Sequence, residues 1–235
     1  MNEISKKMSK EQLNFINSQK SHSKFIKFFQ IFILVLFIFI WEISANLNII
    51  DPFIFSKPSR IMLTAIEMIK NGTLWYHIGI TLFETIIGFT AGTILGTAAA
   101  IVLWWNKTIY DISQPYLVVL NSLPKTALAP IIIVWLGNNM SSIIATALMT
   151  SVIVTVLSVL NGFLNVDEEK SKLIYTINGT KKQVLTKVIL PSTVPNMISA
   201  LKINVGLSFV GVMVGEFLVS KAGLGYMIVY GSQIF

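Results

Sequence analysis

The sequence has no cysteine, only two histidines and few charged residues, and each scarcity excludes a class of protein. The absence of cysteine excludes disulfide frameworks and thiolate metal sites. His22 and His77 are too few for a multi-histidine metal centre. Charged residues make up 12% of the 235 positions. The sequence also lacks a glycine-rich phosphate-binding loop and any recognisable nucleophile arrangement, so it predicts no enzyme and no ATP hydrolysis on this chain.

Apolar residues are abundant. They account for 54% of the chain, and the mean hydropathy is +0.71, which is typical of an integral membrane protein. A helix needs about 20 apolar residues to cross the hydrocarbon core. The sequence therefore predicts an all-α, polytopic helical bundle, because isolated strands leave backbone groups unpaired in lipid. Five spans are expected, at residues 25–45, 78–105, 116–136, 143–164 and 197–219.

The distribution of lysines predicts a cytoplasmic N-terminus. This orientation places most of the basic residues on the cytoplasmic side: Lys6, Lys7, Lys10, Lys20, Lys24, Lys27, Lys107, Lys170, Lys172, Lys181, Lys182 and Lys187. It leaves four outside: Lys57, Arg60, Lys70 and Lys221. Positive cytoplasmic loops thus explain the net charge of +7 without a nucleic-acid partner.

The regions outside the apolar runs divide into three. Residues 1–24 are rich in Ser, Lys, Asn and Gln and are predicted to form a mobile cytoplasmic tail. Residues 59–69 are expected to form a surface helix capped by Ser59. The third region, at about residues 165–195, is a polar loop between two apolar runs. Residues 25–235, which include this loop, are expected to form one transmembrane domain.

The polar loop carries the signals of two short helices. Asp167 stands at an N-cap position and Glu168 lies in the first turn, while Gly179 follows Asn178 as a stop signal. Thr180 can cap a second helix, which Pro191 is expected to interrupt. The alternative is a plain connector, but helix connections are commonly about 2–8 residues long.

Three ordered motifs resemble a known family. Gly179 followed by Ile189, Leu190 and Pro191 resembles the cytoplasmic loop of permease subunits in binding-protein-dependent ABC importers. Residues 123–137, LPKTALAPIIIVWLG, and 215–226, GEFLVSKAGLGY, resemble the nitrate, sulfonate and taurine group of these permeases. The usual Glu-Ala-Ala of the loop is replaced here by residues 172–174, KLI.

The resemblance implies an assembly in the bacterial cytoplasmic membrane. It implies a cytoplasmic ABC ATPase that carries the ATP, a second permease subunit as a homodimer, and an extracellular solute-binding protein. No cofactor is expected on this chain. The cargo would be a small solute, either an anion such as nitrate, sulfonate or taurine, or a vitamin precursor. The resemblance also leads us to expect a sixth span beyond Phe235.

Polar residues inside the apolar runs are candidates for the translocation path, because a charge in lipid costs about 2.5–3.5 kcal/mol on insertion scales. Pro124 and Pro130 break the helix ladder around Lys125, and broken backbone is tolerated where it lines a cavity. Snorkelling is the alternative for Lys125. Glu216 is the fourth candidate, with interfacial anchoring or a packing hydrogen bond as the alternative. Glu42 has the same two alternatives.

Gly88, Gly92 and Gly96 recur every four residues and predict a smooth helix face for close packing, either within the subunit or between subunits. A second functional class is an ion-gradient-driven secondary transporter or channel. That class predicts paired carboxylates or repeated halves with discontinuous helices. The sequence shows isolated acids and no repeat, and this favours the importer permease.

Overall fold

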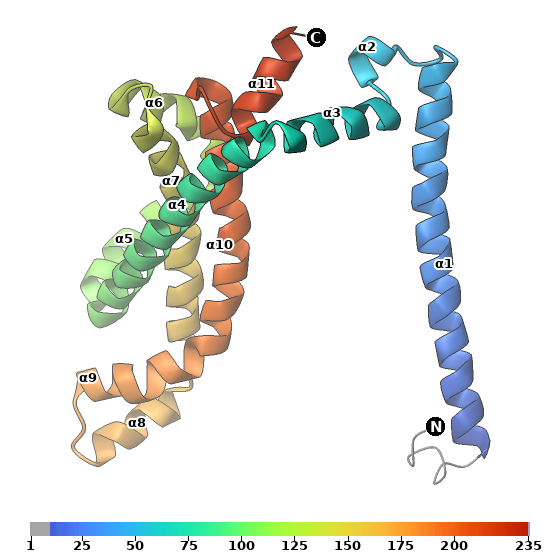
Figure 1. Cartoon of the computed structure of the whole chain (residues 1–235). Helices are drawn as coiled ribbons and strands as arrows, with labels where there is room; N and C mark the ends of the chain where they lie inside the picture. The colour runs from blue at the N-terminus through green and yellow to red at the C-terminus, as the bar shows by residue number, and fades with distance from the viewer. Residues whose placement is uncertain (1–9, 235) are drawn as a thin grey trace. The chain divides into compact units, whose positions relative to one another are not determined.

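The computed structural model describes residues 10–234, which form helices joined by short turns (Figure 1). Four helices are long and apolar enough to cross a membrane, and a bent helix pair raises the number to as many as five. The all-α membrane fold expected from the sequence is therefore confirmed. The chain divides into two compact units, Met1–Asn71 and Gly72–Phe235.

The first unit contains α1 (Lys10–Asn46), α2 (Pro52–Phe55) and α3 (Pro58–Lys70). The helix α1 begins well before residue 25, so residues 10–24 of the predicted tail are helical, and the rest of that tail lies outside the described residues. The prediction that Ser59 caps the surface helix is wrong, because Lys57 occupies the N-cap of α3. Ser59 instead donates from its backbone N–H and its hydroxyl to the Glu42 carboxylate, at 3.0 and 2.8 Å.

The second unit contains the remaining helices. They are α4 (Thr73–Trp105), α5 (Lys107–Ser122), the 3-10 turn η2 (Lys125–Leu128), α6 (Ala129–Leu136), α7 (Met140–Leu164), α8 (Glu168–Thr176), α9 (Lys181–Val184), the π-helical turn η3 (Leu185–Ile189), α10 (Leu190–Val219) and α11 (Leu224–Ile234). In Figure 1, α7 and α10 run along each other, with α8 and α9 at one end of the pair and α6 and α11 at the other.

The third predicted span is not one straight helix. The chain bends by 93° between Lys107–Ser122 and Lys125–Leu136. Pro124 disfavours helical backbone at the residue before it, and Leu123 is accordingly extended, with φ −68° and ψ 139°. The expectation of a broken helix ladder at Pro124 agrees with this bend.

The glycine face of α4 packs against α7. A Cβ atom on Gly88 would lie 2.6 Å from the Ala147 Cβ, and one on Gly96 would lie 2.5 Å from the Thr155 Cβ. Gly92, between them, faces the Ser151 side chain. Small residues therefore recur every four positions on both helices, and the two backbones approach closely. These three glycines of α4 therefore pack within the subunit, which is the first of the two roles predicted for them.

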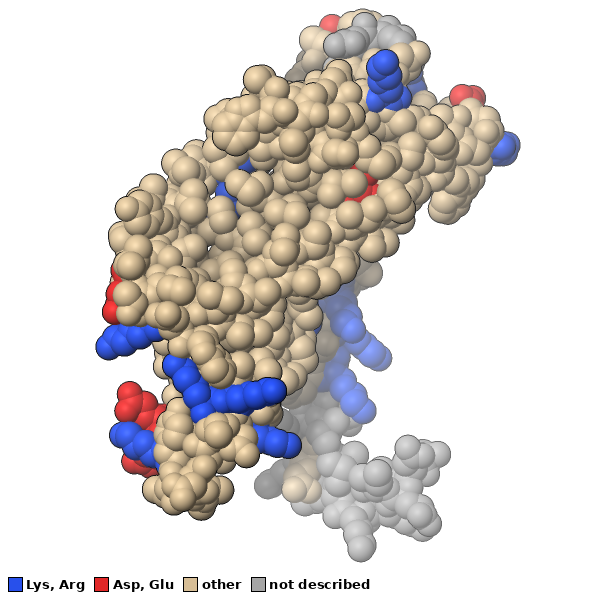
Figure 2. Space-filling model, turned by 90° about the vertical axis from the view of Figure 1, so that its left-hand side faces the viewer, with Lys and Arg blue, Asp and Glu red and all other residues tan. Residues whose placement is uncertain are grey.

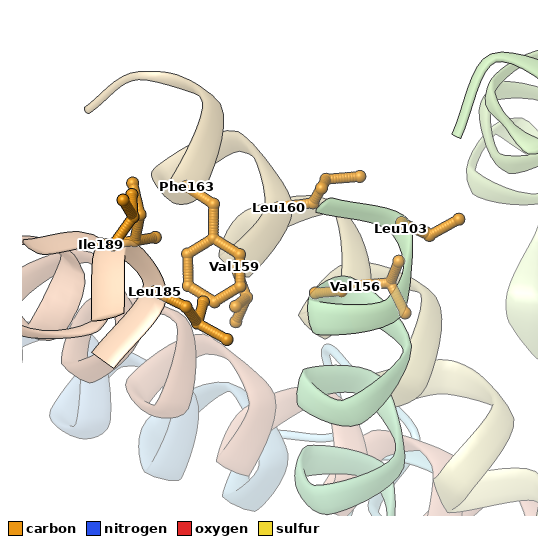
Figure 3. Close-up of a cluster of buried hydrophobic side chains, with 9 residues drawn as sticks. Leu103, Val156, Val159, Leu160, Phe163, Leu185 and Ile189 are labelled. Atoms are coloured by element: carbon orange, nitrogen blue, oxygen red, sulfur yellow. The ribbon is translucent and has the colours of Figure 1, made fainter. Parts of the chain in front are cut away.

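A buried apolar cluster closes the end of the bundle where α8 and α9 lie. Figure 3 shows how the side chains from α4, α7 and the segment around η3 meet there. Its labelled members are Leu103, Val156, Val159, Leu160, Phe163, Leu185 and Ile189. Because α9 and η3 contribute to this cluster, the second helix of the polar loop is fixed to the bundle core.

Candidate functional site

The first helix of the polar loop, α8, is built as the sequence predicts and has no buried residue. Asp167 is its N-cap and accepts a hydrogen bond from the Glu169 N–H at 2.9 Å. Glu168 pairs with Lys172 one turn later at 3.2 Å, an exposed ion pair that contributes little stability. The apolar side chains of Leu173 and Ile177 remain 64% and 73% exposed. The outer helix therefore presents an uncovered apolar surface with charges beside it.

The turn between the two helices needs a glycine. The Gly179 N–H donates to the Ile174 carbonyl oxygen at 2.8 Å. A Cβ on Gly179 would lie 2.6 Å from that same oxygen, which is closer than real side chains come. Asn178, just before it, has φ +57°, a left-handed conformation that Asn adopts more readily than most residues. The close turn brings α9 back alongside α8.

The second helix, α9, is tied to the end of α4. Thr180 and Gln183 form a capping box at its start. Lys181 donates from Nζ to the Trp105 carbonyl oxygen at 2.6 Å. The same Nζ lies 5.4 Å from the ring centroid of Trp104 and 5.6 Å from that of Trp105. The Lys181 ammonium group thus binds a carbonyl oxygen at the C-terminus of α4, where a positive charge interacts favourably with the helix dipole.

The structure corrects the expectation for Pro191. No break occurs there: residues Lys181–Val219 form one continuous helical stretch. The π-helical turn η3 comes immediately before it, with the Leu190 N–H donating to the Leu185 carbonyl oxygen. Pro191 lies in the first turn of α10, a position where its missing N–H is tolerated. Leu190 and Pro191 therefore connect the polar loop rigidly to α10.

Basic side chains gather at this end of the unit. On the face shown in Figure 2, most of the blue lysine atoms surround the region of α8 and α9, and the middle of the face is almost entirely uncharged. The lysines on these two helices are Lys170, Lys172, Lys181 and Lys182. The distribution fits a bundle with an apolar band and one positive end.

The opposite end of the unit holds the candidate path residues. An open pocket of about 430 Å³ lies between η2, α6, α10 and α11, and its lining is apolar apart from Thr126. Pro130 lines it together with Val210, Met213 and Phe217. Pro124, Lys125 and Glu216 are not among its lining residues. Lys125 folds back instead and donates from Nζ to the Asn121 carbonyl oxygen at 3.1 Å.

Glu216 is fully buried, and it is not isolated. Glu84 of α4 is buried as well, and each of the two side chains is 1% exposed. Thr81 donates to Glu216 Oε1 at 2.6 Å, and the Gly225 N–H donates to Oε2 at 2.6 Å. The bond from Thr81 joins α4 to α10 across a separation in sequence that no local pattern reveals. No cluster of three or more metal-ligating side chains occurs among the described residues.

The comparisons with known proteins agree with this architecture. Residues 92–235 match the family described as "Binding-protein-dependent transport system inner membrane component". The chain is 32% identical to the formylaminopyrimidine transport permease protein ThiX of Halalkalibacterium halodurans, over 83% of this chain and 77% of that protein. It is 28% identical to the putative aliphatic sulfonates transport permease protein SsuC of Bacillus subtilis, over 83% of this chain and 70% of that protein.

A solved structure supports the same fold. The inward-facing MetNI methionine ABC transporter superposes with a TM-score of 0.57 at 19% identity, covering 66% of this chain and 78% of that chain. At this level of identity the likeness concerns the fold alone.

Proposed function

The chain belongs to the family of binding-protein-dependent transport system inner membrane components. We propose that its α8–α9 loop binds the ATPase subunit and transmits the movement of that subunit to the membrane helices. The chain is a membrane-spanning permease subunit of an ABC importer, and the family assembles in general with an ATPase and a substrate-binding protein. ATP is held by that partner rather than by this chain.

One observation carries the proposal: the loop is exposed on one side and fixed to the bundle on the other. Leu173 and Ile177 offer apolar surface to a partner, whereas Val184 and Ile189 are 1% and 2% exposed and lie in the bundle core. Lys181 adds a direct link to the end of α4. A push on α8 is therefore carried through α9 into α4, α7 and α10, because packed elements move as rigid bodies rather than deforming.

The loop also sets the proposed orientation. An ATPase acts in the cytoplasm, so the end of the unit with α8 and α9 faces inward. The lysines around these helices support this orientation. The N-terminus then lies in the cytoplasm, the membrane is the bacterial cytoplasmic membrane, and α6 and α11 lie toward the outside. The second permease subunit is a second copy of this chain.

We place the cargo among small organic solutes without net charge. We take the open pocket beside α11 as part of the path. Its lining has no charged side chain, and an anion would need a cation or several hydrogen-bond donors there. This favours a vitamin precursor, or a solute such as the formylaminopyrimidine named for ThiX, over the sulfonate named for SsuC. Competition of labelled pyrimidine-precursor uptake by excess taurine or nitrate tests the choice. Strong competition by either anion would contradict it.

The coupling role is tested by Gly179→Val. The added side chain collides with the Ile174 carbonyl and must open the turn. We expect uptake to be lost together with co-purification of the ATPase. The matched control is Gly206→Val on α10, where a Cβ meets nothing within 4 Å. If Gly179→Val left both uptake and co-purification unchanged, the loop would not be the coupling surface.

A further inference from the structure

The connection between α1 and α4 leaves large apolar side chains exposed. It spans residues 47–72 and contains the helices α2 and α3, neither of which has a buried residue. Five large apolar side chains ahead of α3 are each more than half exposed: Leu47, Ile49, Phe53, Ile54 and Phe55. So much exposed apolar surface on a short segment is typical of a region that contacts a membrane or another protein.

The helix α3 has its apolar side chains mainly on one face. Six positions follow the spacing of a single helix face, and they hold Ile61, Met62, Ala65, Ile66, Met68 and Ile69. The other half of the helix surface carries Arg60, Thr64 and Glu67, with Leu63 as its apolar member. A helix with this division is typical of helices that lie in the membrane interface, with the apolar face toward the acyl chains.

Hydrogen bonds fix the start of α3 to the last turns of α1. Ser59 donates twice to the Glu42 carboxylate, as described above. Asn46 Nδ2 donates to Glu42 Oε1 at 3.3 Å, and Lys57 Nζ donates to Asn46 Oδ1 at 3.1 Å. Within this unit, α3 runs from that point across the direction of α1 (Figure 1). These side chains therefore hold the two helices at an angle to each other.

The same contacts set the depth of α3 in the membrane. Glu42 directly follows the apolar run that ends at Trp41, in a helix long and apolar enough to span a membrane. A carboxylate is costly among acyl chains, so Glu42 lies at the level of the lipid headgroups. Ser59 is bonded to it and lies at that level too. A helix that starts there and runs across a membrane-spanning helix stays along the membrane surface.

The charges of α3 suit a lipid partner. Basic residues stand at its N-cap, in its first turn and at its last position: Lys57, Arg60 and Lys70. Glu67 is the one acidic residue within Pro58–Lys70. The resulting positive charge complements the phosphate groups of the lipids, which lie at the same level as Glu42 and Ser59.

We propose that α3 lies in the headgroup region of the leaflet where α1 ends, with its apolar face inserted between the acyl chains and its basic residues at the lipid phosphates. Glu42 is then a positioning residue that joins this surface helix to the spanning helix α1. The lipid bilayer, rather than a neighbouring protein, covers Ile61, Ile66 and Ile69. This placement does not depend on the function proposed for the polar loop.

The test uses single thiols, each carrying a nitroxide spin label, in the full cysteine-free chain reconstituted in vesicles of phosphatidylcholine and phosphatidylglycerol. Ile66→Cys places the label on the apolar face, and Glu67→Cys places it on the opposite face. Phe37→Cys on α1 is the reference for a label among acyl chains. Molecular oxygen concentrates in the bilayer and a nickel chelate in water, so the ratio of their collision rates with the label reports its surroundings.

We expect the oxygen-to-nickel ratio to be several-fold higher at position 66 than at position 67, and nearer to that at position 37. Met62→Cys and Thr64→Cys repeat the comparison on the same two faces. A nickel rate above the oxygen rate at position 66 would mean that the face lies in water, and low rates for both reagents would mean that protein covers it. Either result overturns the proposal.

The same labels separate lipid from a protein partner. When the ATPase and the binding protein are added to the vesicles, the ratio at position 66 should not change, because lipid still covers the face. A fall in both collision rates on their addition would identify a protein partner and overturn the proposal. The measurement requires no transport, so its outcome is independent of the coupling role of the α8–α9 loop.

Discussion

Replacing Lys181 by methionine removes the direct link between the polar loop and the end of α4. Methionine keeps the apolar stem, so the packing of α9 is retained while the charge is lost. Lys182 stands next to it, is exposed, and makes no contact with Trp104 or Trp105 in the described residues. Lys182→Met is therefore a control with the same change of charge, on the same helix.

The size of the effect follows from the lost contacts. A hydrogen bond to a charged group contributes about 1.5–3 kcal/mol, and an exposed cation–π contact about 0.5–1 kcal/mol. The ammonium group is exposed to solvent, which reduces the sum to about 1–2 kcal/mol. If this free energy links the loop to α4, its loss lowers the equilibrium constant for that link by a factor of about 5–30.

The assay is the number of solute molecules imported per ATP hydrolysed in proteoliposomes. We expect Lys181→Met to lower this ratio several-fold while the ATPase still co-purifies, because the surface of α8 is intact. Lys181→Arg should restore most of the ratio, since a guanidinium can reach the same carbonyl and rings. A ratio in Lys181→Met equal to that in Lys182→Met would refute the proposed path through α4.

Two further predictions concern the bundle. Gly88→Ala places a methyl group 2.6 Å from the Ala147 Cβ and should destabilise the purified subunit by about 1–3 kcal/mol. Gly79→Ala on the same helix is the control, because its methyl group meets nothing within 4 Å and should not destabilise the subunit. Equal melting temperatures for the two variants in detergent would contradict the close contact of α4 and α7. A proton gradient without ATP should drive no uptake although Glu84 and Glu216 are both buried, and uptake under those conditions would favour an ion-driven transporter.

The sequence predicts helices well where the apolar runs are long, and poorly where backbone details decide. The spans around α4, α7 and α10 follow from length and hydropathy alone. At Pro124 the expected break takes the form of a 93° bend, an angle that proline chemistry does not fix. At Pro191 the expected break is absent, because a π-helical turn precedes it and the proline falls in the first turn of α10.

In the candidate site, too, local features could be predicted and contacts between distant helices could not. Asp167, Gly179 and Thr180 could be predicted because caps and turns depend on neighbouring residues. The contacts of Lys181 with Trp105 and of Thr81 with Glu216 could not, because they join helices that are distant in sequence. Buried acids in an apolar run are themselves a signal, since each one needs a partner. That signal indicates that a partner exists but does not identify it.

The absence of cysteine from the chain allows the most direct test, which is a single introduced thiol carrying a cross-linker. Ile177→Cys places it on the exposed apolar surface of the loop, and Lys221→Cys places it on the exposed turn at the opposite end of the unit. In the assembled transporter, the thiol at position 177 should cross-link to the ATPase and the thiol at position 221 should not. Cross-linking from position 221 with none from position 177 would contradict the coupling role of the α8–α9 loop.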